Sequence, residues 1–385
     1  MYRLNDEQQR VVAEATAVAD ARIGPYAANV DQQAAFPRQS IAALGERGLL
    51  GLTIPAAHGG LGHGLRTMAA TIDTVAQRCP STAMVYLMHL CGVACYLAAP
   101  GKTDTLLREA AAGRHLSTLA FSEKGSRSHF WAPVSRAATD DGTGGVRLNA
   151  SKSFVTSAGH ADGYVTSTLA AGATTPLEST IYLVLGGDAG LSVSGAWRGL
   201  GLRGNASAPM TLVNVTLGTD RALSDPGKGL DMMLGVVLPT FQVGTAAVAV
   251  GIAEAAVQAA IGHATHTRLE HMNSSLAELP TLRAQIAAMR IETDRARAHL
   301  GAVLDSLETP GPATQLMVLE AKAAATEAAV AVTDMAMRTC GGAAFAGAHG
   351  IERMFRDARA SIVMAPTSDQ AYDFIGRALC GLEVF

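Results

Sequence analysis

The sequence has no surplus of basic residues and few charged residues of either sign. Its 385 residues include 30 Lys and Arg against 33 Asp and Glu, which gives a net charge of −3. Because no excess of cations is available to neutralise phosphates, nucleic acid is not expected as a partner. Charged residues make up 16% and hydrophobic residues 49%. This composition excludes an intrinsically disordered chain and indicates extensive buried surface.

Cysteine is sparse, and its spacing contains no CxxC pair. The five cysteines are Cys79, Cys91, Cys95, Cys340 and Cys380. Their odd number and irregular spacing argue against a disulfide framework and against a zinc site, so no metal is expected. Unpaired cysteines are typical of a reducing compartment. The N-terminal run MYRLNDEQQR also lacks the apolar core of a signal peptide, so we expect a cytoplasmic protein.

Aromatic residues are scarce at 5%, and one long uncharged run, residues 232–253, needs interpretation. The run is long enough to span a bilayer. It contains Pro239, Gln242 and many Ala and Gly residues, so its hydrophobicity is weak. We therefore predict a buried helix in a closely packed bundle and no membrane span.

The pattern along the chain predicts three domains in the order helices, strands, helices. Residues 1–115 are expected to be helical, with Asn5 as the first N-cap and Pro37 at the start of a second helix. Residues 116–225 contain short β-type runs such as STIYLVLG and MTLVNVTL, which predict an antiparallel sandwich or barrel. Residues 226–385 hold long Ala-rich segments and predict a helical bundle. The fold class is therefore α+β, without a doubly wound parallel sheet.

One glycine motif imitates a dinucleotide fingerprint. Gly199, Gly201 and Gly204 have the spacing G-x-G-x-x-G. A nicotinamide site needs a helix directly after such glycines, so that pyrophosphate meets the helix N-terminus. Here the following run, APMTLVNVTL, predicts a strand. The motif is interpreted as a tight turn between strands, and no nicotinamide site is assigned to it.

Five segments in order resemble the acyl-CoA dehydrogenase superfamily of flavoproteins. FPRQSIAALGERGLLGLTIPAAHGGLG matches its entry segment, and AFSEKGSRSH resembles its A-x-T-E-P-G-x-G-S-D loop. LNASKSFVTSAGHAD resembles its L-N-G-x-K-x-W-I-T-N-A-x-x-A-D strands, and GLGLRGN its L-G-x-R-G-S hairpin. RTCGGAAFAGAHGIERMFRDAR resembles its Gly-Gly and R-D-A region. The resemblance implies a helical domain, a central β domain and a C-terminal four-helix bundle, assembled as a homodimer or homotetramer.

The resemblance also implies a flavin, FAD, with ring contacts from Ser122 and Thr156 and an aromatic wall from Phe154. Hydroxyl groups suit this role because they can donate to ring nitrogen or oxygen. Arg268 corresponds to an arginine that reaches the dinucleotide phosphate, although this chain has Glu270-His271-Met272 where the family has Phe-Gly after that arginine. The full set of expected cofactor contacts is Phe121, Ser122, Ser128, Phe154, Thr156, Arg268, Arg338, Gly341, Gly342, Thr367 and Asp369.

The carboxylate base of the family's dehydrogenases is missing. Removing the α-proton of a thioester needs such a base within hydrogen-bond reach. The resemblance places it at Ala365, or in a minority of members at Phe241, and neither residue is acidic. The nitroalkane oxidases of this fold also need an acid at the first position. This loss favours a two-component monooxygenase, which takes reduced flavin (FADH2) from a separate reductase and uses O2 to hydroxylate an aromatic or other small natural product.

Three functions remain open from the sequence. For the monooxygenase, whose best analogy is the bacterial indole hydroxylases of terpenoid biosynthesis, Ser122 and His129 are the candidate catalytic residues. The expected substrate contacts are Trp131, Phe241 and Ala365. The second function is an acyl-CoA or acyl-carrier dehydrogenase whose base is relocated to Glu123, Asp369 or His129. The third is a flavin-binding protein without redox activity.

Overall fold

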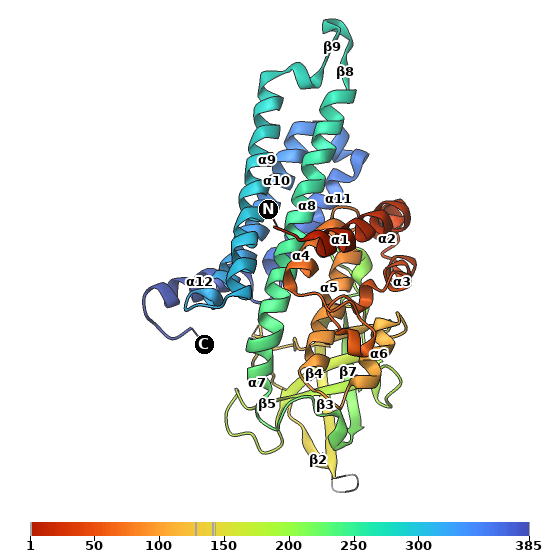
Figure 1. Ribbon diagram of the computed structural model, residues 1–385, viewed down its shortest axis with the longest axis vertical. Coiled ribbons are helices and arrows are strands. Elements are labelled where there is room, and N and C mark those ends of the chain that lie inside the picture. Colours follow the sequence, from red (N-terminus) through yellow and green to blue (C-terminus); the bar gives the residue numbers. More distant parts are fainter. Residues whose placement is uncertain (1, 128, 141, 143, 385) are drawn as a thin grey trace.

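The computed structural model describes residues 2–127, 129–140, 142 and 144–384. The molecule is elongated, with a long helical bundle above a β domain and the N-terminal helices against its side (Figure 1). The order of helices, strands and helices is as predicted, and the fold is α+β. The termini lie on the bundle side of the molecule and not on the β domain (Figure 1).

The N-terminal part is helical, and its first helix begins where the sequence predicts. Asn5 caps α1 by accepting a hydrogen bond from the Gln8 backbone N–H, and the Gln8 side chain returns a bond to the Asn5 backbone. Pro37 immediately precedes α3. The helices are α1 (Asp6–Val18), α2 (Ala27–Gln32), α3 (Arg38–Glu46), α4 (Leu65–Ala76), α5 (Pro80–Leu97) and α6 (Asp104–Ala111).

The β domain consists of two sheets with the strand orders β1-β4-β5 and β2-β3-β7-β6. Its strands are β1 (Ser117–Ala120), β2 (Ala138–Asp140), β3 (Gly145–Val155), β4 (Gly163–Leu169), β5 (Ser179–Leu185), β6 (Leu191–Val193) and β7 (Ala208–Leu217). The pairs are antiparallel as predicted, except that β1 lies parallel to β4. The exception arises because β2 and β3 intervene in the other sheet, so β1 and β4 cannot form a hairpin.

The C-terminal part forms the bundle. Its helices are α7 (Gly229–Met232), α8 (Leu238–His266), α9 (Pro280–Glu308), α10 (Thr314–Phe345), α11 (Ile351–Val363) and α12 (Ser368–Leu379). A short hairpin of β8 (Arg268–Leu269) and β9 (Ser274–Ser275) joins α8 to α9 at the far tip of the bundle (Figure 1). The sequence analysis predicted only helices here, because two-residue strands leave no readable periodicity.

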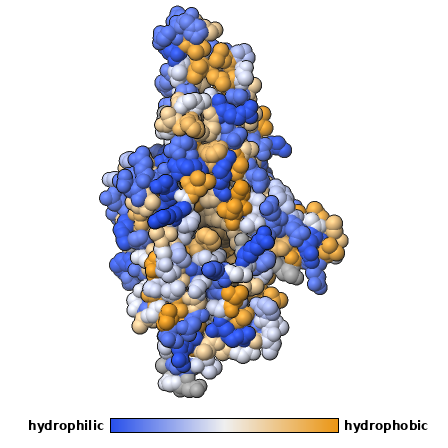
Figure 2. All heavy atoms as spheres, turned by 180° about the vertical axis from the view of Figure 1, so that it is seen from behind, coloured by the Kyte–Doolittle hydropathy of each residue, from blue (hydrophilic) through white to orange (hydrophobic). Residues whose placement is uncertain are grey.

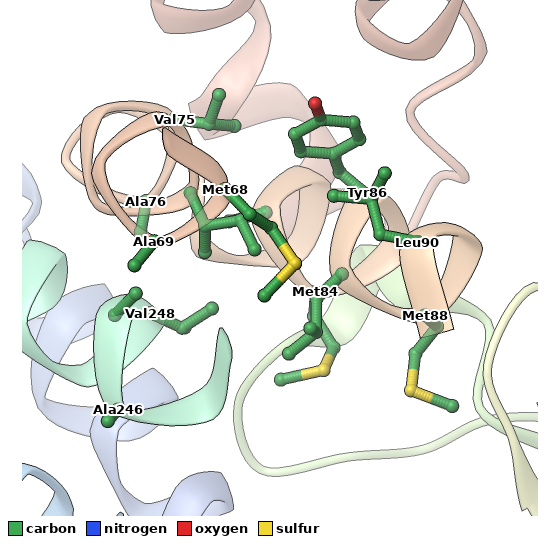
Figure 3. Packing of buried hydrophobic residues seen from close by; sticks show 14 of the residues in the cluster. Met68, Ala69, Val75, Ala76, Met84, Tyr86, Met88, Leu90, Ala246 and Val248 are labelled. Atoms are coloured by element: carbon green, nitrogen blue, oxygen red, sulfur yellow. The ribbon is translucent and has the colours of Figure 1, made fainter. Parts of the chain in front are cut away.

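Close packing of α8 against α4 and α5 depends on small residues. A Cβ atom added to Gly244 would lie 2.1 Å from Leu87, and one added to Gly251 would lie 2.5 Å from the Asp73 carbonyl oxygen. Figure 3 shows the resulting core, in which Met68 and Met84 point toward the same region as Val248. The Ala- and Gly-rich composition of the run 232–253 is explained by this close approach.

Two helical segments are long and apolar enough to cross a membrane by length and composition alone. They are α5 and the continuous segment Gly229–His266. Most of each lies inside the fold, 89% and 78% of the respective apolar windows. They are core helices, as the sequence analysis predicted for the second of them.

Candidate functional site

A cavity of about 1000 Å³ lies where the three parts of the chain meet. Its walls come from α5, from β1 with the loop that follows it, from β3 and β7, from the start of α8, and from α11 with the link to α12. Of the residues predicted to contact cofactor or substrate, Phe121, Ser122, Phe154, Thr156, Phe241, Ala365 and Thr367 line it. The structure therefore brings together residues that are up to 246 positions apart in the sequence.

One side of the cavity carries hydroxyl groups. Ser122 lies two residues after the end of β1, and its carbonyl oxygen accepts a hydrogen bond of 2.8 Å from the Ser153 backbone N–H of β3. The Ser122 side chain is half-buried and makes no hydrogen bond to another described residue. The Thr156 hydroxyl is buried and shares a 2.9 Å hydrogen bond with the Ser207 hydroxyl. The Ser122 hydroxyl is therefore available to a bound molecule, while the Thr156 hydroxyl already has one partner in the wall.

Phe154 presents an aromatic surface to the cavity from a strained position. It is 70% exposed and has a φ of 56°, where the register of β3 against β7 shifts. The Trp197 ring meets it edge-on, with ring centroids 6.5 Å apart. An exposed phenyl ring held in the left-handed region is the kind of local strain that persists at binding sites. A flat apolar ring with hydrogen-bonding edges, such as a flavin, fits this wall and the neighbouring hydroxyls.

Another part of the cavity wall is apolar. Met84 and Met88 contribute one turn of α5, Phe121 and Phe130 lie near the end of β1, and Phe241 comes from the first turns of α8. The Phe121 and Phe130 rings are stacked with centroids 6.5 Å apart. Such walls exclude water and favour an apolar, flat ligand. Met84, Met88 and Trp197 were missed by the sequence analysis, because a Met or Trp on an apolar helix or loop gives no signal that separates core from cavity.

Glu123 and Lys152 form a buried ion pair in the cavity wall. Lys152 Nζ donates to Glu123 Oε1 at 2.6 Å, and the two side chains are 0% and 1% exposed. Glu123 Oε2 also accepts from the Val134 and Ser135 backbone N–H groups at 2.8 Å each, and the Ser135 hydroxyl donates to Oε1. Burial favours the neutral acid, but Lys152 and these donors hold the pKa of Glu123 below its usual value. The pair fixes the loop after β1 to β3, and the sequence analysis did not predict it.

Lys322 of α10 hydrogen-bonds to the backbone of the wall segment around Ala365. Its ammonium group is fully buried and donates to the Met364 carbonyl at 3.3 Å and to the Pro366 carbonyl at 2.9 Å. These two carbonyls flank Ala365, which faces the cavity. Burial lowers the pKa of Lys322 to about 8, although Glu327 and Asp369 act in the opposite direction. Lys322 therefore positions the segment where the resemblance places the missing base.

The lowered pKa of Lys322 predicts a rise in stability at alkaline pH. The unfolded lysine titrates near 10.4, so between about pH 8 and 10 the unfolded chain binds more protons than the folded one. The free energy of unfolding should therefore increase over this window, by an amount on the order of 2–3 kcal/mol from this group. Urea denaturation between about pH 7.5 and pH 10 measures this increase. The Lys322→Met variant should lack this rise; an equal rise in the variant would contradict the assignment.

Two other predicted residues, His129 and Trp131, lie beside the cavity and not in its lining. His129 is exposed, with its ring centroid 5.1 Å from that of Trp131. Trp131 is buried and packs against Phe130 and Phe374. Phe130, and not Trp131, lines the cavity, although Trp131 was the predicted substrate contact. Ser128 lies outside the described residues.

The remaining predicted cofactor contacts do not line the cavity of their own chain. Arg268 lies in β8 at the tip of the bundle, where it donates to the Asn273 side chain at 2.9 Å. Arg338, Gly341 and Gly342 are exposed on α10, which is kinked at Gly341 with a φ of 55°. Asp369 is exposed in the first turn of α12. Figure 1 shows the β8–β9 tip at the opposite end of the molecule from the β domain.

The glycines of the G-x-G-x-x-G motif serve close packing. The strand β7 follows them, as predicted, and not a helix. A Cβ atom at Gly201 would lie 2.3 Å from the Arg356 carbonyl oxygen, and one at Gly204 would lie 2.2 Å from Val30. The Leu202 backbone N–H between them donates to buried Asp357 at 2.6 Å. The loop thereby joins the β domain to α11 and lacks the helix N-terminus that a pyrophosphate site needs.

Comparison with protein families identifies all three parts of the chain. The acyl-CoA dehydrogenase N-terminal domain matches residues 5–106, the middle domain residues 118–215, and the C-terminal domain residues 227–380. The chain belongs to the acyl-CoA dehydrogenase superfamily. The resemblance inferred from the five motifs is thereby confirmed, and with it the family's flavin cofactor, FAD or FMN.

Individual relatives cover the chain almost completely at low identity. The probable acyl-CoA dehydrogenase YngJ of Bacillus subtilis is 27% identical over 98% of this chain and 99% of its own. The cyclohex-1-ene-1-carbonyl-CoA dehydrogenase of Geobacter metallireducens has the same identity and coverage. Among solved structures, butyryl-CoA dehydrogenase from Megasphaera elsdenii superposes with a TM-score of 0.91 at 20% identity, covering 98% of this chain and 99% of that one. TdsC from Paenibacillus, in complex with FMN and indole, gives 0.87 at 22% identity and 97% coverage of both chains.

Proposed function

We propose that this superfamily member is a flavin-dependent monooxygenase, which uses reduced flavin and O2 to hydroxylate an aromatic or other small natural product. The observation that carries the proposal is the absence of a free carboxylate among the described residues of the cavity wall. Glu123 is the one acidic residue there, and it is held by Lys152, Ser135 and the Val134 backbone. Ala365 and Phe241, where the resemblance places the base, offer only methyl and phenyl groups.

The chain's own residues suit such a reaction. When bound, the flavin supplies the redox chemistry with O2. Phe154 and the hydroxyls of Ser122 and Thr156 line the cavity and would bind and orient its ring. The Ser122 hydroxyl has no partner among the described residues and would donate a hydrogen bond toward the reacting oxygen. The apolar wall formed by Phe121, Phe130 and the methionines of α5 would exclude water from the reacting oxygen. Exclusion of water prevents unproductive side reactions.

A direct test follows from the missing base. Saturated acyl-CoA thioesters added anaerobically to the flavin-loaded protein should leave the flavin absorbance unchanged, because no carboxylate in the cavity is free to remove the α-proton. The Ala365→Glu variant places a carboxylate at the position that faces the cavity between the two carbonyls held by Lys322. The flavin of this variant should be bleached slowly if the cavity admits the thioester. Rapid bleaching of the unmodified protein would overturn the monooxygenase proposal.

The alternative is an acyl-CoA or acyl-carrier dehydrogenase with a relocated base. The names of the curated relatives favour it, since YngJ is described as a probable acyl-CoA dehydrogenase. Its base would have to be Glu123, Asp369 or His129. Glu123 would first have to leave its ion pair with Lys152, while Asp369 and His129 are exposed and outside the cavity lining. The anaerobic thioester experiment separates the two proposals.

We further propose that the protein is a homodimer or homotetramer, works in the cytoplasm, and obtains reduced flavin from a separate reductase. Phe345, Val363 and Leu379 are 84%, 66% and 71% exposed. Hydrophobic atoms are visible on the projecting C-terminal region at the right of Figure 2. Assembly would cover them and would bring Arg268 and the Gly341 kink of one subunit near the cavity of another.

Light scattering at micromolar concentration should give at least twice the chain mass of 39.6 kDa. Phe345→Glu should shift the protein toward monomers, because it buries a charge in the proposed contact. The variant Arg10→Glu, at an exposed polar position of α1, is the matched control and should leave the mass unchanged. A monomeric mass for the unmodified protein would exclude the proposed assembly.

A further inference from the structure

The mouth of the cavity carries two cations that have no partner among the described residues. Lys124 and Arg127 lie in the loop after β1, are exposed and line the cavity. The other charged residues of the lining, Glu123 and Lys152, cancel each other in their ion pair. The lining therefore carries two uncompensated positive charges in a chain whose net charge is −3. A cavity with low-dielectric walls concentrates such a field on its contents.

The backbone of this loop is held in a costly conformation. Arg127 has a φ of 38°, in the left-handed region, and Gly125 has a φ of 102°. A non-glycine residue in that region is strained and persists where the surroundings fix it. The ion pair of Glu123 with Lys152, and the bond from the Ser126 hydroxyl to the Glu123 carbonyl at 3.1 Å, anchor the loop on the side of Ser122. The two cations are thus presented by a fixed loop and not by a free surface segment.

Their position relative to the ring-binding residues suggests what they bind. Lys124 is two residues beyond Ser122 along the same loop, at most about 7 Å by chain length. A flavin whose ring lies against Ser122, Thr156 and Phe154 carries its phosphate on a ribityl chain that leads away from the ring. A lysine and an arginine are the side chains best suited to receive such a group, the second through its fork of donors.

We propose that Lys124 and Arg127 form a phosphate-binding subsite at the mouth of the cavity, filled by a phosphate of the flavin. The subsite rests on flavin binding alone and is independent of the reaction that the flavin performs. A phosphate-bearing substrate offers the same chemistry, so the experiment distinguishes the two sources of phosphate. The motif A-x-T-E-P-G-x-G-S-D has Pro at the position of Lys124 and Gly at the position of Arg127. The two cations are therefore not part of the family motif.

The test compares flavins with and without phosphate. Apoprotein is titrated with riboflavin, FMN and FAD, and binding is followed by flavin fluorescence. The Lys124→Gln/Arg127→Gln variant should bind FMN and FAD at least about tenfold more weakly, because it loses two charge-assisted hydrogen bonds, and should bind riboflavin unchanged. The control Arg10→Gln/Lys228→Gln removes the same charge at exposed positions outside the cavity lining and should alter none of the three affinities.

Inorganic pyrophosphate identifies the source of the phosphate. If the flavin phosphate fills the subsite, pyrophosphate should compete with FMN but not with riboflavin in the unmodified protein, and should lose this effect in the Lys124→Gln/Arg127→Gln variant. If pyrophosphate binds to FMN-loaded protein without displacing FMN, the phosphate subsite exists but receives a phosphate of the substrate. This result would overturn the assignment to the flavin phosphate. Equal weakening of riboflavin and FMN, or no change in either together with no pyrophosphate binding, would overturn the subsite itself.

Discussion

Replacing Ser122 with Ala should reduce product formation by about 10²–10³-fold, the usual effect of removing one preorganised donor at a reacting oxygen. The Ser122 hydroxyl lines the cavity and makes no hydrogen bond to another described residue, so the substitution leaves no buried group unpaired. Oxygen should still be consumed, but it should appear as hydrogen peroxide. Simultaneous measurement of O2 uptake, hydroxylated product and hydrogen peroxide gives the coupling ratio.

Flavin affinity and fold should change little in Ser122→Ala, because one neutral hydrogen bond contributes roughly 1 kcal/mol. Ser122→Thr restores the residue of the family motif and should keep part of the activity. Ser194→Ala, at an exposed serine that also lines the cavity, is the control and should retain full coupling. If coupling in Ser122→Ala equals that of the unmodified protein, another group supplies the hydrogen bond, and His129 is then the first to be examined.

The second large effect concerns the buried ion pair. Lys152→Met should destabilise the protein by about 3–5 kcal/mol, because it leaves Glu123 charged and uncompensated in the interior. The double variant Glu123→Gln/Lys152→Met should recover a large part of this loss, since neither buried charge remains. Chemical denaturation of the three proteins measures these differences at neutral pH. Equal destabilisation by the single and double variants would show that packing, and not charge, is what Lys152 provides.

The same pair predicts an acid-dependent component of stability. Lys152 and the donors from Ser135 hold the folded-state pKa of Glu123 below its unfolded value of about 4.3. The folded chain therefore binds fewer protons than the unfolded chain just below that pH, and stability falls as the pH drops through this range. Glu123→Gln should lose less stability on acidification than the unmodified protein. A steeper acid loss in the variant would contradict the charged state assigned to Glu123.

Local signals in the sequence were sufficient for much of the fold. Asn5 and Pro37 mark helix starts by chemistry that acts over a few residues, and both predictions are confirmed. The run after Gly204 forms β7 because its β-branched residues outweigh the glycine motif before it. The parallel pairing of β1 with β4 could not be read in this way, because it depends on which sheet each intervening strand joins.

The site was predictable only where a motif marked it. Ser122, Phe154 and Thr156 belong to segments that resemble the superfamily, and the structure brings them to one cavity. Trp131 and Phe130 are adjacent aromatic residues, and the sequence carries no signal for which of them faces the cavity. The Glu123–Lys152 pair joins residues 29 positions apart and is visible only once β3 lies beside the loop after β1. Long-range partners of this kind require the fold.

The proposed monooxygenase activity requires that the cavity support oxygen transfer and not thioester oxidation. The measurement that tests it most directly is a reaction of the protein with chemically reduced FAD, isotopically labelled O2 and indole, analysed by mass spectrometry. Indole is an apolar, flat probe suited to walls formed by Phe121, Phe130 and Phe241. We expect a hydroxylated product that carries the label, with less of it from Ser122→Ala. An absence of labelled product from a panel of aromatic and other small substrates, together with bleaching of the oxidised flavin by an acyl-CoA, would contradict it.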